Sequence, residues 1–207
     1  ASDVYKRQGK DYKNMSDQDE AKFRMIEYHK WKFKAKIFSP LAPLTVKRTP
    51  VLMTRVEYGF LGSYNKYKKS PFETFYMGGD GMSGYSSTYA TETIGLRGYE
   101  NGSIAGNGGY NSYGYAYSRL SMELRYPFLL EPSSTIYGLV FVEAGNAWRD
   151  LKDFNPFQLK RSAGVGVRIF LPMIGLMGID WAYGFDRPDG YDQRGGSNFH
   201  FIIGQEF

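Results

Sequence analysis

Seven segments of the chain alternate apolar with polar or small residues at a period of two. In the segment 119–128, Leu120, Met122 and Leu124 share one parity, and Glu123 and Arg125 share the other. Successive side chains of a β-strand point to opposite faces, so this pattern predicts strands with one apolar and one polar face. The chain is therefore expected to be all-β, with seven antiparallel strands at 23–38, 51–61, 119–128, 136–148, 161–171, 176–185 and 198–207. A proline at position 127 is expected to end the third strand.

The composition agrees with strands that face lipid on one side. Aromatic residues make up 17% of the 207 residues, and the mean hydropathy is −0.45. A low mean hydropathy is compatible with a transmembrane barrel, because only alternate residues meet lipid. No apolar run reaches the length of about eighteen residues that a transmembrane helix needs. Seven strands cannot satisfy both edges of a membrane sheet, so either further strands precede them or the chain is a soluble sandwich.

Charge and residue counts argue against several classes of function. The formal net charge of +5 comes partly from four lysines on one strand face, Lys30, Lys32, Lys34 and Lys36. The aromatic residues of that strand lie on the opposite face, which argues against nucleic-acid binding by stacking and basic contacts. There is no cysteine, and the two histidines, His29 and His200, lack the spacing of metal ligands. We expect no metal or nucleotide cofactor and no enzymatic activity, and we expect His200 to face the inside of the barrel.

A long region rich in Gly, Tyr, Ser and Asn separates the second and third predicted strands. It covers residues 62–116 and contains the sequence Leu96-Arg97-Gly98-Tyr99. A loop of this length within one domain is usually functional or without fixed structure. We expect it to fold back into the barrel, the alternative being a loop on the outer surface. The first eight residues resemble a translated sequencing adapter, which leaves 9–207 as the expected C-terminal fragment of a barrel domain.

Several motifs in order resemble the C-terminal part of the BamA family of outer-membrane β-barrel proteins. The family's loop motif Val-Arg-Gly-Phe is present as Leu96-Arg97-Gly98-Tyr99, after a lead of Phe-Tyr-Met-Gly-Gly at 75–79. Glu123 matches an acidic position of the family, and Glu143 stands where the family commonly has aspartate. The last segment resembles the family's closing strand with its β-signal, and its residues are Phe199, Phe201, Ile203, Gly204 and Phe207. The departures at 96, 99 and 143 keep the chemistry but change the side-chain size.

This resemblance implies where the loop lies. In a normally sixteen-stranded transmembrane barrel, Arg97 would dock on the inner wall beside Glu123 and Glu143. The parity of the strands agrees, because both carboxylates alternate with apolar neighbours and so point away from lipid. A guanidinium offers a planar fork of donors that suits two carboxylates. The alternative is that Arg97 is a solvated loop charge, while the two glutamates pair with Arg125 and Arg168.

The resemblance also implies a function and a location. A BamA-type barrel lies in the bacterial outer membrane and folds and inserts other β-barrel proteins without nucleotide. Its expected partners are outer-membrane lipid, unfolded outer-membrane proteins and accessory lipoproteins, the last bound through periplasmic domains upstream of this sequence. Two alternatives remain at this point: a polypeptide-secreting barrel of the same superfamily, and a plain porin-like channel.

Overall fold

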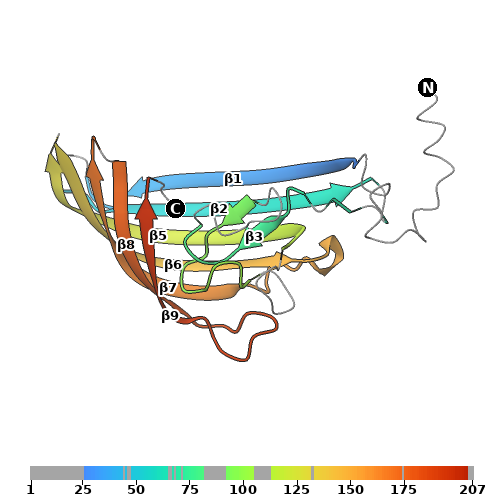
Figure 1. The fold of residues 1–207 in the computed structure, drawn as a ribbon. Helices are drawn as coiled ribbons and strands as arrows, with labels where there is room; N and C mark the ends of the chain where they lie inside the picture. Colours follow the sequence, from blue (N-terminus) through green and yellow to red (C-terminus); the bar gives the residue numbers. More distant parts are fainter. Residues whose placement is uncertain are drawn as a thin grey trace, which may run out of the picture.

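A computed structural model describes residues 26–43, 45, 48–64, 67, 69–70, 72–81, 92–104, 113–131, 133–173 and 175–204. Within these residues seven strands form one antiparallel sheet in the order β1-β2-β5-β6-β7-β8-β9 (Figure 1). They are β1 (Tyr28–Pro40), β2 (Val51–Ser63), β5 (Ala116–Glu131), β6 (Ser134–Trp148), β7 (Lys160–Leu171), β8 (Gly175–Gly184) and β9 (Gly196–Ile203). Two shorter strands, β3 (Phe75–Met77) and β4 (Glu92–Ile94), pair in parallel, and one 3-10 turn, η1, covers Leu151–Asp153.

The seven predicted strands are present, and their bounds differ in instructive ways. Strand β5 does not end at Pro127 as predicted, because Pro127 still pairs with Tyr137 and the strand continues to Glu131. A shift in register between Pro127 and Leu129 forms a bulge there, and a bulge is one of the few places where a sheet tolerates proline. The predicted non-strand region contains β3 and β4. The predicted β-signal residue Phe207 lies outside the described residues.

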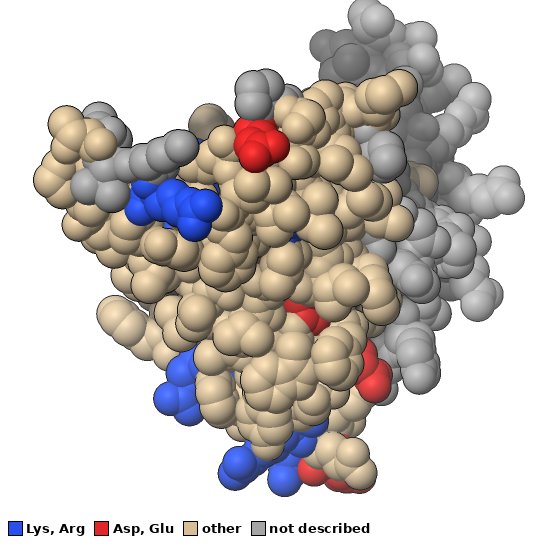
Figure 2. All heavy atoms as spheres, turned by 90° about the vertical axis from the view of Figure 1, so that its left-hand side faces the viewer, with Lys and Arg blue, Asp and Glu red and all other residues tan. Residues whose placement is uncertain are grey.

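The two faces of the sheet differ as the alternation predicts. On β1 the outward residues Trp31, Phe33 and Ile37 are exposed, and Trp31 keeps 69% of its surface. The inward lysines contact carboxylates: Lys34 Nζ lies 2.9 Å from an oxygen of Glu57 on β2. Figure 2 shows one side of the molecule on which uncharged residues cover most of the described surface, while charged groups lie mainly towards its upper and lower edges. Among the described residues no helix is long and apolar enough to cross a membrane.

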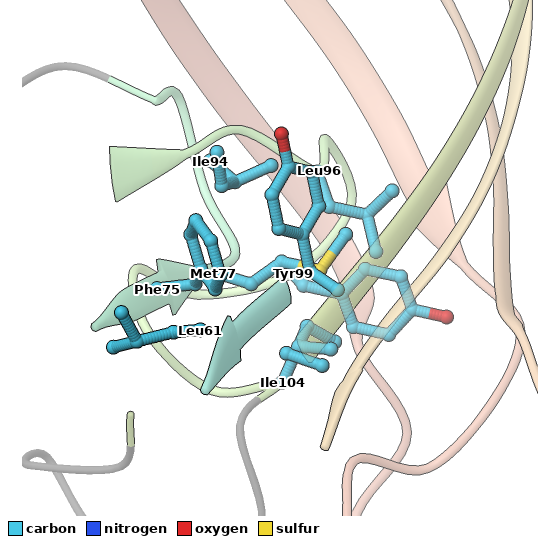
Figure 3. Packing of buried hydrophobic residues seen from close by; sticks show 9 residues of the cluster. Leu61, Phe75, Met77, Ile94, Leu96, Tyr99 and Ile104 are labelled. Carbon is cyan, nitrogen blue, oxygen red and sulfur yellow. The ribbon is translucent and has the colours of Figure 1, made fainter. Parts of the chain in front are cut away.

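The hydrophobic core lies between the sheet and the segment that carries β3 and β4. This segment covers one face of the sheet (Figure 1), and β3 contacts both β5 and β6. Side chains from the segment and from the wall are fully buried together (Figure 3): Leu61, Phe75, Met77, Ile94, Leu96, Tyr99, Ile104, Tyr117 and Ala147. Phe75 packs edge-on against Tyr117 of β5 at 4.6 Å between ring centroids. The loop is therefore fixed to the inner face by apolar burial as well as by its polar groups.

Candidate functional site: the docked arginine loop

The sequence Leu96-Arg97-Gly98-Tyr99 follows β4 and lies against the inner face of the sheet. Leu96 exchanges two backbone hydrogen bonds of 3.1 Å with Gly79, and its side chain is fully buried in the core. Gly79 has a φ of 74°, so the turn after β3 uses the left-handed region that glycine adopts without strain. This pairing fixes the backbone directly before Arg97 and sets the direction in which the guanidinium points.

Arg97 is completely buried and donates hydrogen bonds to three carboxylates. Its Nη2 lies 2.5 Å from Glu123 Oε1 and 2.8 Å from Glu143 Oε1, and its Nη1 lies 2.9 Å from Asp180 Oδ2. Its backbone N–H donates to Glu143 Oε2 at 3.0 Å. The guanidinium also lies 3.5 Å above the centre of the Phe141 ring, which adds a cation–π contact. The structure thus brings together residues of the loop, β5, β6 and β8.

Each of the three carboxylates also binds an arginine of the wall. Arg125 donates to Glu123 at 2.7 Å, Arg119 donates to Glu143 at 2.8 Å, and Arg168 donates to Asp180 at 2.5 and 2.7 Å. The site therefore holds four guanidiniums and three carboxylates, all largely shielded from solvent. Such reciprocal pairing is needed because a buried charge without partners is strongly destabilising.

The electrostatics of this cluster keep Arg97 charged. Burial by itself lowers the pKa of Arg97, but attraction by Glu143 and Glu123 outweighs burial and raises the pKa above its ordinary value. Among the described residues no group of three His, Cys, Asp or Glu side chains is arranged to hold a metal ion. The acidic groups at this site are instead occupied by guanidinium donors.

Gly98 allows the loop to approach the sheet more closely than any other residue could. Its φ is 88°, and an added Cβ would lie 2.9 Å from the backbone nitrogen of Gly184 and 2.9 Å from Cβ of Ser162. Its N–H donates to Nε2 of His200 at 2.9 Å, so the loop also contacts β9. Because Nε2 accepts this bond, that nitrogen carries no proton in the docked arrangement.

Tyr99 fixes the far end of the motif. Its ring is fully buried, and its hydroxyl donates to the carbonyl of Arg161 on β7 at 2.7 Å. The same oxygen accepts the N–H of Asp186, which follows β8, at 3.3 Å. Burial raises the pKa of Tyr99 to about 12, so the hydroxyl stays protonated over the physiological range.

Comparison with known proteins places this site in a family. The model of the Omp85 superfamily domain matches residues 21–207, which is most of the chain. The chain belongs to the Omp85 superfamily. It is an outer-membrane β-barrel protein of bacteria, and the apolar outer face of its sheet is the face that meets lipid.

One solved structure shows the same Omp85 fold. A crystal structure of BamA from Haemophilus ducreyi lacking POTRA domains 1–3 matches with a TM-score of 0.58 and 21% sequence identity. The match covers 85% of this chain and 35% of that chain, so the sequence spans about a third of the BamA structure. No curated protein sequence matches the chain.

Strand β9, which the resemblance predicts to be the closing strand, has the expected division of faces within its described part. Phe199, Phe201 and Ile203 are exposed on the outside, whereas His200 and Ile202 are buried on the inside. Gly204 has a φ of 73° and donates its N–H to the carbonyl of Leu176 at 2.7 Å. The alternation in 198–203 is thus the same signal that distinguishes the faces of the other strands.

Arg119, which binds Glu143, and Asp180 are the charged residues of the Arg97 site that the sequence pattern did not reveal. The neighbours of Asp180, Ile179 and Trp181, are exposed, and Asp180 itself is fully buried. The parity of β8 alone could have placed this carboxylate on the inner face. Arg168, weighed as a partner of the glutamates, instead binds Asp180, because Arg168 pairs with Gly178 in register and Asp180 lies two residues further on the same face.

Proposed function

We propose that this chain forms the C-terminal seven strands of a sixteen-stranded barrel that folds and inserts other outer-membrane proteins. The barrel would work without nucleotide or metal. Its partners would be outer-membrane lipid, unfolded outer-membrane proteins and accessory lipoproteins bound through periplasmic domains. Membership of the Omp85 superfamily supports a barrel of this kind. The docked loop is the feature that favours protein assembly over secretion or solute transport.

The observation that carries the proposal is the burial of Arg97 between three carboxylates. The loop lies on the inner face of the sheet, where a solute or a secreted polypeptide would have to pass. Moving it would break three charge-assisted side-chain hydrogen bonds, each contributing about 1.5–3 kcal/mol. A barrel that secretes through its lumen would have to bear this cost in each cycle. A barrel that acts on clients at its wall can keep the loop in place.

In this proposal the site residues have distinct roles. Leu96, Arg97, Gly98 and Tyr99 anchor the loop, and Glu123 and Glu143, with Asp180, receive its guanidinium. The residues Phe199, Phe201, Ile203, Gly204 and Phe207 belong to the strand that closes the barrel and carries its β-signal. An edge strand that can unpair offers backbone donors and acceptors to an incoming strand by β-augmentation. The anchored loop would hold the inner side of that strand through the bond from Gly98 to His200.

The test uses the full-length protein encoded by the source DNA, reconstituted in lipid vesicles. A urea-unfolded porin is added, and its insertion is measured by protease protection and by heat-modifiable migration on gels. We expect insertion to be faster than in empty vesicles and to need no nucleotide. Transport of a soluble polypeptide into the vesicles, or ion conductance without any gain in porin insertion, would support a secretion barrel or a channel instead.

A further inference from the structure

A second polar site lies on the inner face of the sheet, about Arg55 of β2. A cavity of about 190 Å³ is lined by wall residues of β1, β2, β5 and β9 and, on the loop side, by β4, Gly95 and the residues 80–81 after β3. The volume corresponds to about six water molecules at ~30 Å³ each, which is sufficient for a small oxyanion. Four cationic residues line this cavity, Lys32, Lys34, Arg55 and Arg119, together with three carboxylates, Asp80, Glu57 and Glu92.

Arg55 is the cation in this cavity whose charge is least compensated. Its side chain keeps only 2% of its surface, yet Nε and Nη2 have no hydrogen-bond partner among the described residues. The nearest carboxylate contact is 3.9 Å, from Nε to Glu57 Oε1, which is longer than a hydrogen bond. A buried guanidinium with open donors is costly unless an acceptor reaches it.

Glu57 accepts no hydrogen bond from Arg55 in this arrangement, and two other cations lie close to its carboxylate. Lys34 Nζ lies 2.9 Å from Glu57 Oε1, and Arg119 Nη1 lies 3.8 Å from Glu57 Oε2. In register, Arg55 lies directly between Lys36 of β1 and Ser121 of β5. Arg55 therefore presents its open Nε and Nη2 donors at one point of the cavity.

We propose that this cavity binds a free oxyanion of the size of inorganic phosphate, with Arg55 as its main ligand. Arg119 and Lys34 would contribute charge from the two sides, and the fork of Arg55 matches the geometry of phosphate oxygens. The opposite wall of the cavity is formed by Glu92, Thr93 and the residues after them in the loop. An anion bound to Arg55 would reach the loop through uncharged lining such as Thr93, since Glu92 would repel it, and by binding the docked state preferentially it would stabilise the docked loop. This site adjoins the Arg97 cluster, since Arg119 lines the cavity and also donates to Glu143, and it does not depend on which client the barrel handles.

The experiment titrates inorganic phosphate into the full-length protein folded in detergent, at constant ionic strength maintained with sodium chloride. Binding is followed by isothermal calorimetry and by ³¹P line broadening, and hydrogen exchange of residues 92–95 reports on the loop. We expect saturable binding and slower exchange of the loop. Arg55→Met should weaken phosphate binding about ten- to hundredfold, because the variant loses one charge-assisted hydrogen bond to the anion. Lys69→Met, which removes an exposed lysine paired with Asp150, should leave binding unchanged.

Two further variants keep the test decisive if Arg55→Met does not fold, as judged by heat-modifiable migration. Arg55→Lys retains the charge without the fork and should lose less affinity than the methionine variant. Lys34→Met should weaken binding several-fold, since Lys34 lines the cavity. Wild-type protein that shows no saturable phosphate binding overturns the proposal. Equal affinity in wild type and all the cavity variants also overturns it.

Discussion

The sharpest prediction concerns the replacement Arg97→Met, which removes the charge of the loop and keeps much of its length. The side chain would lose hydrogen bonds of 2.5, 2.8 and 2.9 Å to three different carboxylates. Removing one partner of a buried ion pair typically costs about 3–5 kcal/mol. Here each carboxylate keeps a second guanidinium of the wall, and three carboxylates then face three arginines. We therefore expect the lower limit, about 3 kcal/mol of lost docking free energy.

The matched control is Arg125→Met. Arg125 also binds a buried carboxylate, with hydrogen bonds of 2.7 and 3.0 Å to Glu123. It lies on the wall, however, and Glu123 keeps its bond to Arg97 in this variant. The loop should remain docked, with a change in docking free energy of no more than about 1 kcal/mol. The two variants thus remove the same type of side chain from one cluster, and only one of them belongs to the loop.

Hydrogen exchange measured by mass spectrometry on peptides covering 92–104 gives the docking free energy. The backbone N–H groups of Arg97 and Gly98 donate to Glu143 and His200, so they exchange only when the loop opens. A loss of about 3 kcal/mol should speed their exchange about 10²-fold in Arg97→Met, and the control should change by less than tenfold. Both variants must first show heat-modifiable migration, which demonstrates a folded barrel. Equal acceleration in the two variants, or none in Arg97→Met, would refute the docking role of Arg97.

Three other predictions use the same exchange measurement. Gly98→Ala should undock the loop. The control is Gly175→Ala: Gly175 has a φ of 93° but no atom within 4 Å of an added Cβ, so this change should only strain its own turn. Similar exchange of 92–104 in the two variants would contradict the close approach of the motif to the sheet. Tyr99→Phe should cost about 1 kcal/mol of docking at pH 7. Because burial raises the pKa of Tyr99 to about 12, above its ordinary value near 10, wild-type docking should weaken as the pH rises through this window, and the phenylalanine variant should lack that component. Burial by itself raises the pKa of Glu92, but hydrogen bonds from two lysines of β1 lower the pKa overall. The contribution of Glu92 to docking is therefore present above about pH 4.5 and lost at lower pH. Glu92→Gln should remove this acid dependence and change the docking free energy at pH 7 by less than about 1 kcal/mol, as is usual for partly exposed pairs.

The sequence by itself determined the strands and their faces, because the period of two is a local property of each segment. It placed Glu123 and Glu143 on the inner face because each alternates with apolar neighbours, and in the structure the neighbours Met122 and Val142 are indeed exposed. It also identified the arginine motif as the feature of the long loop that merits a role. These inferences need no knowledge of which strands are neighbours in space.

Only the tertiary structure decided which groups meet. Arg97 and Asp180 are 83 residues apart, and Gly98 and His200 are 102 residues apart, so their contacts depend on sheet order, register and the path of the loop. The pairing of β3 with β4 has no signal in the alternation, since each strand has three residues and is fixed by packing against the wall. The open donors of Arg55 likewise follow from register, because neighbouring strands place Lys36 and Ser121 beside it and no carboxylate within hydrogen-bonding distance. Parity fixes the face of a side chain, but register and the docked loop fix its partners.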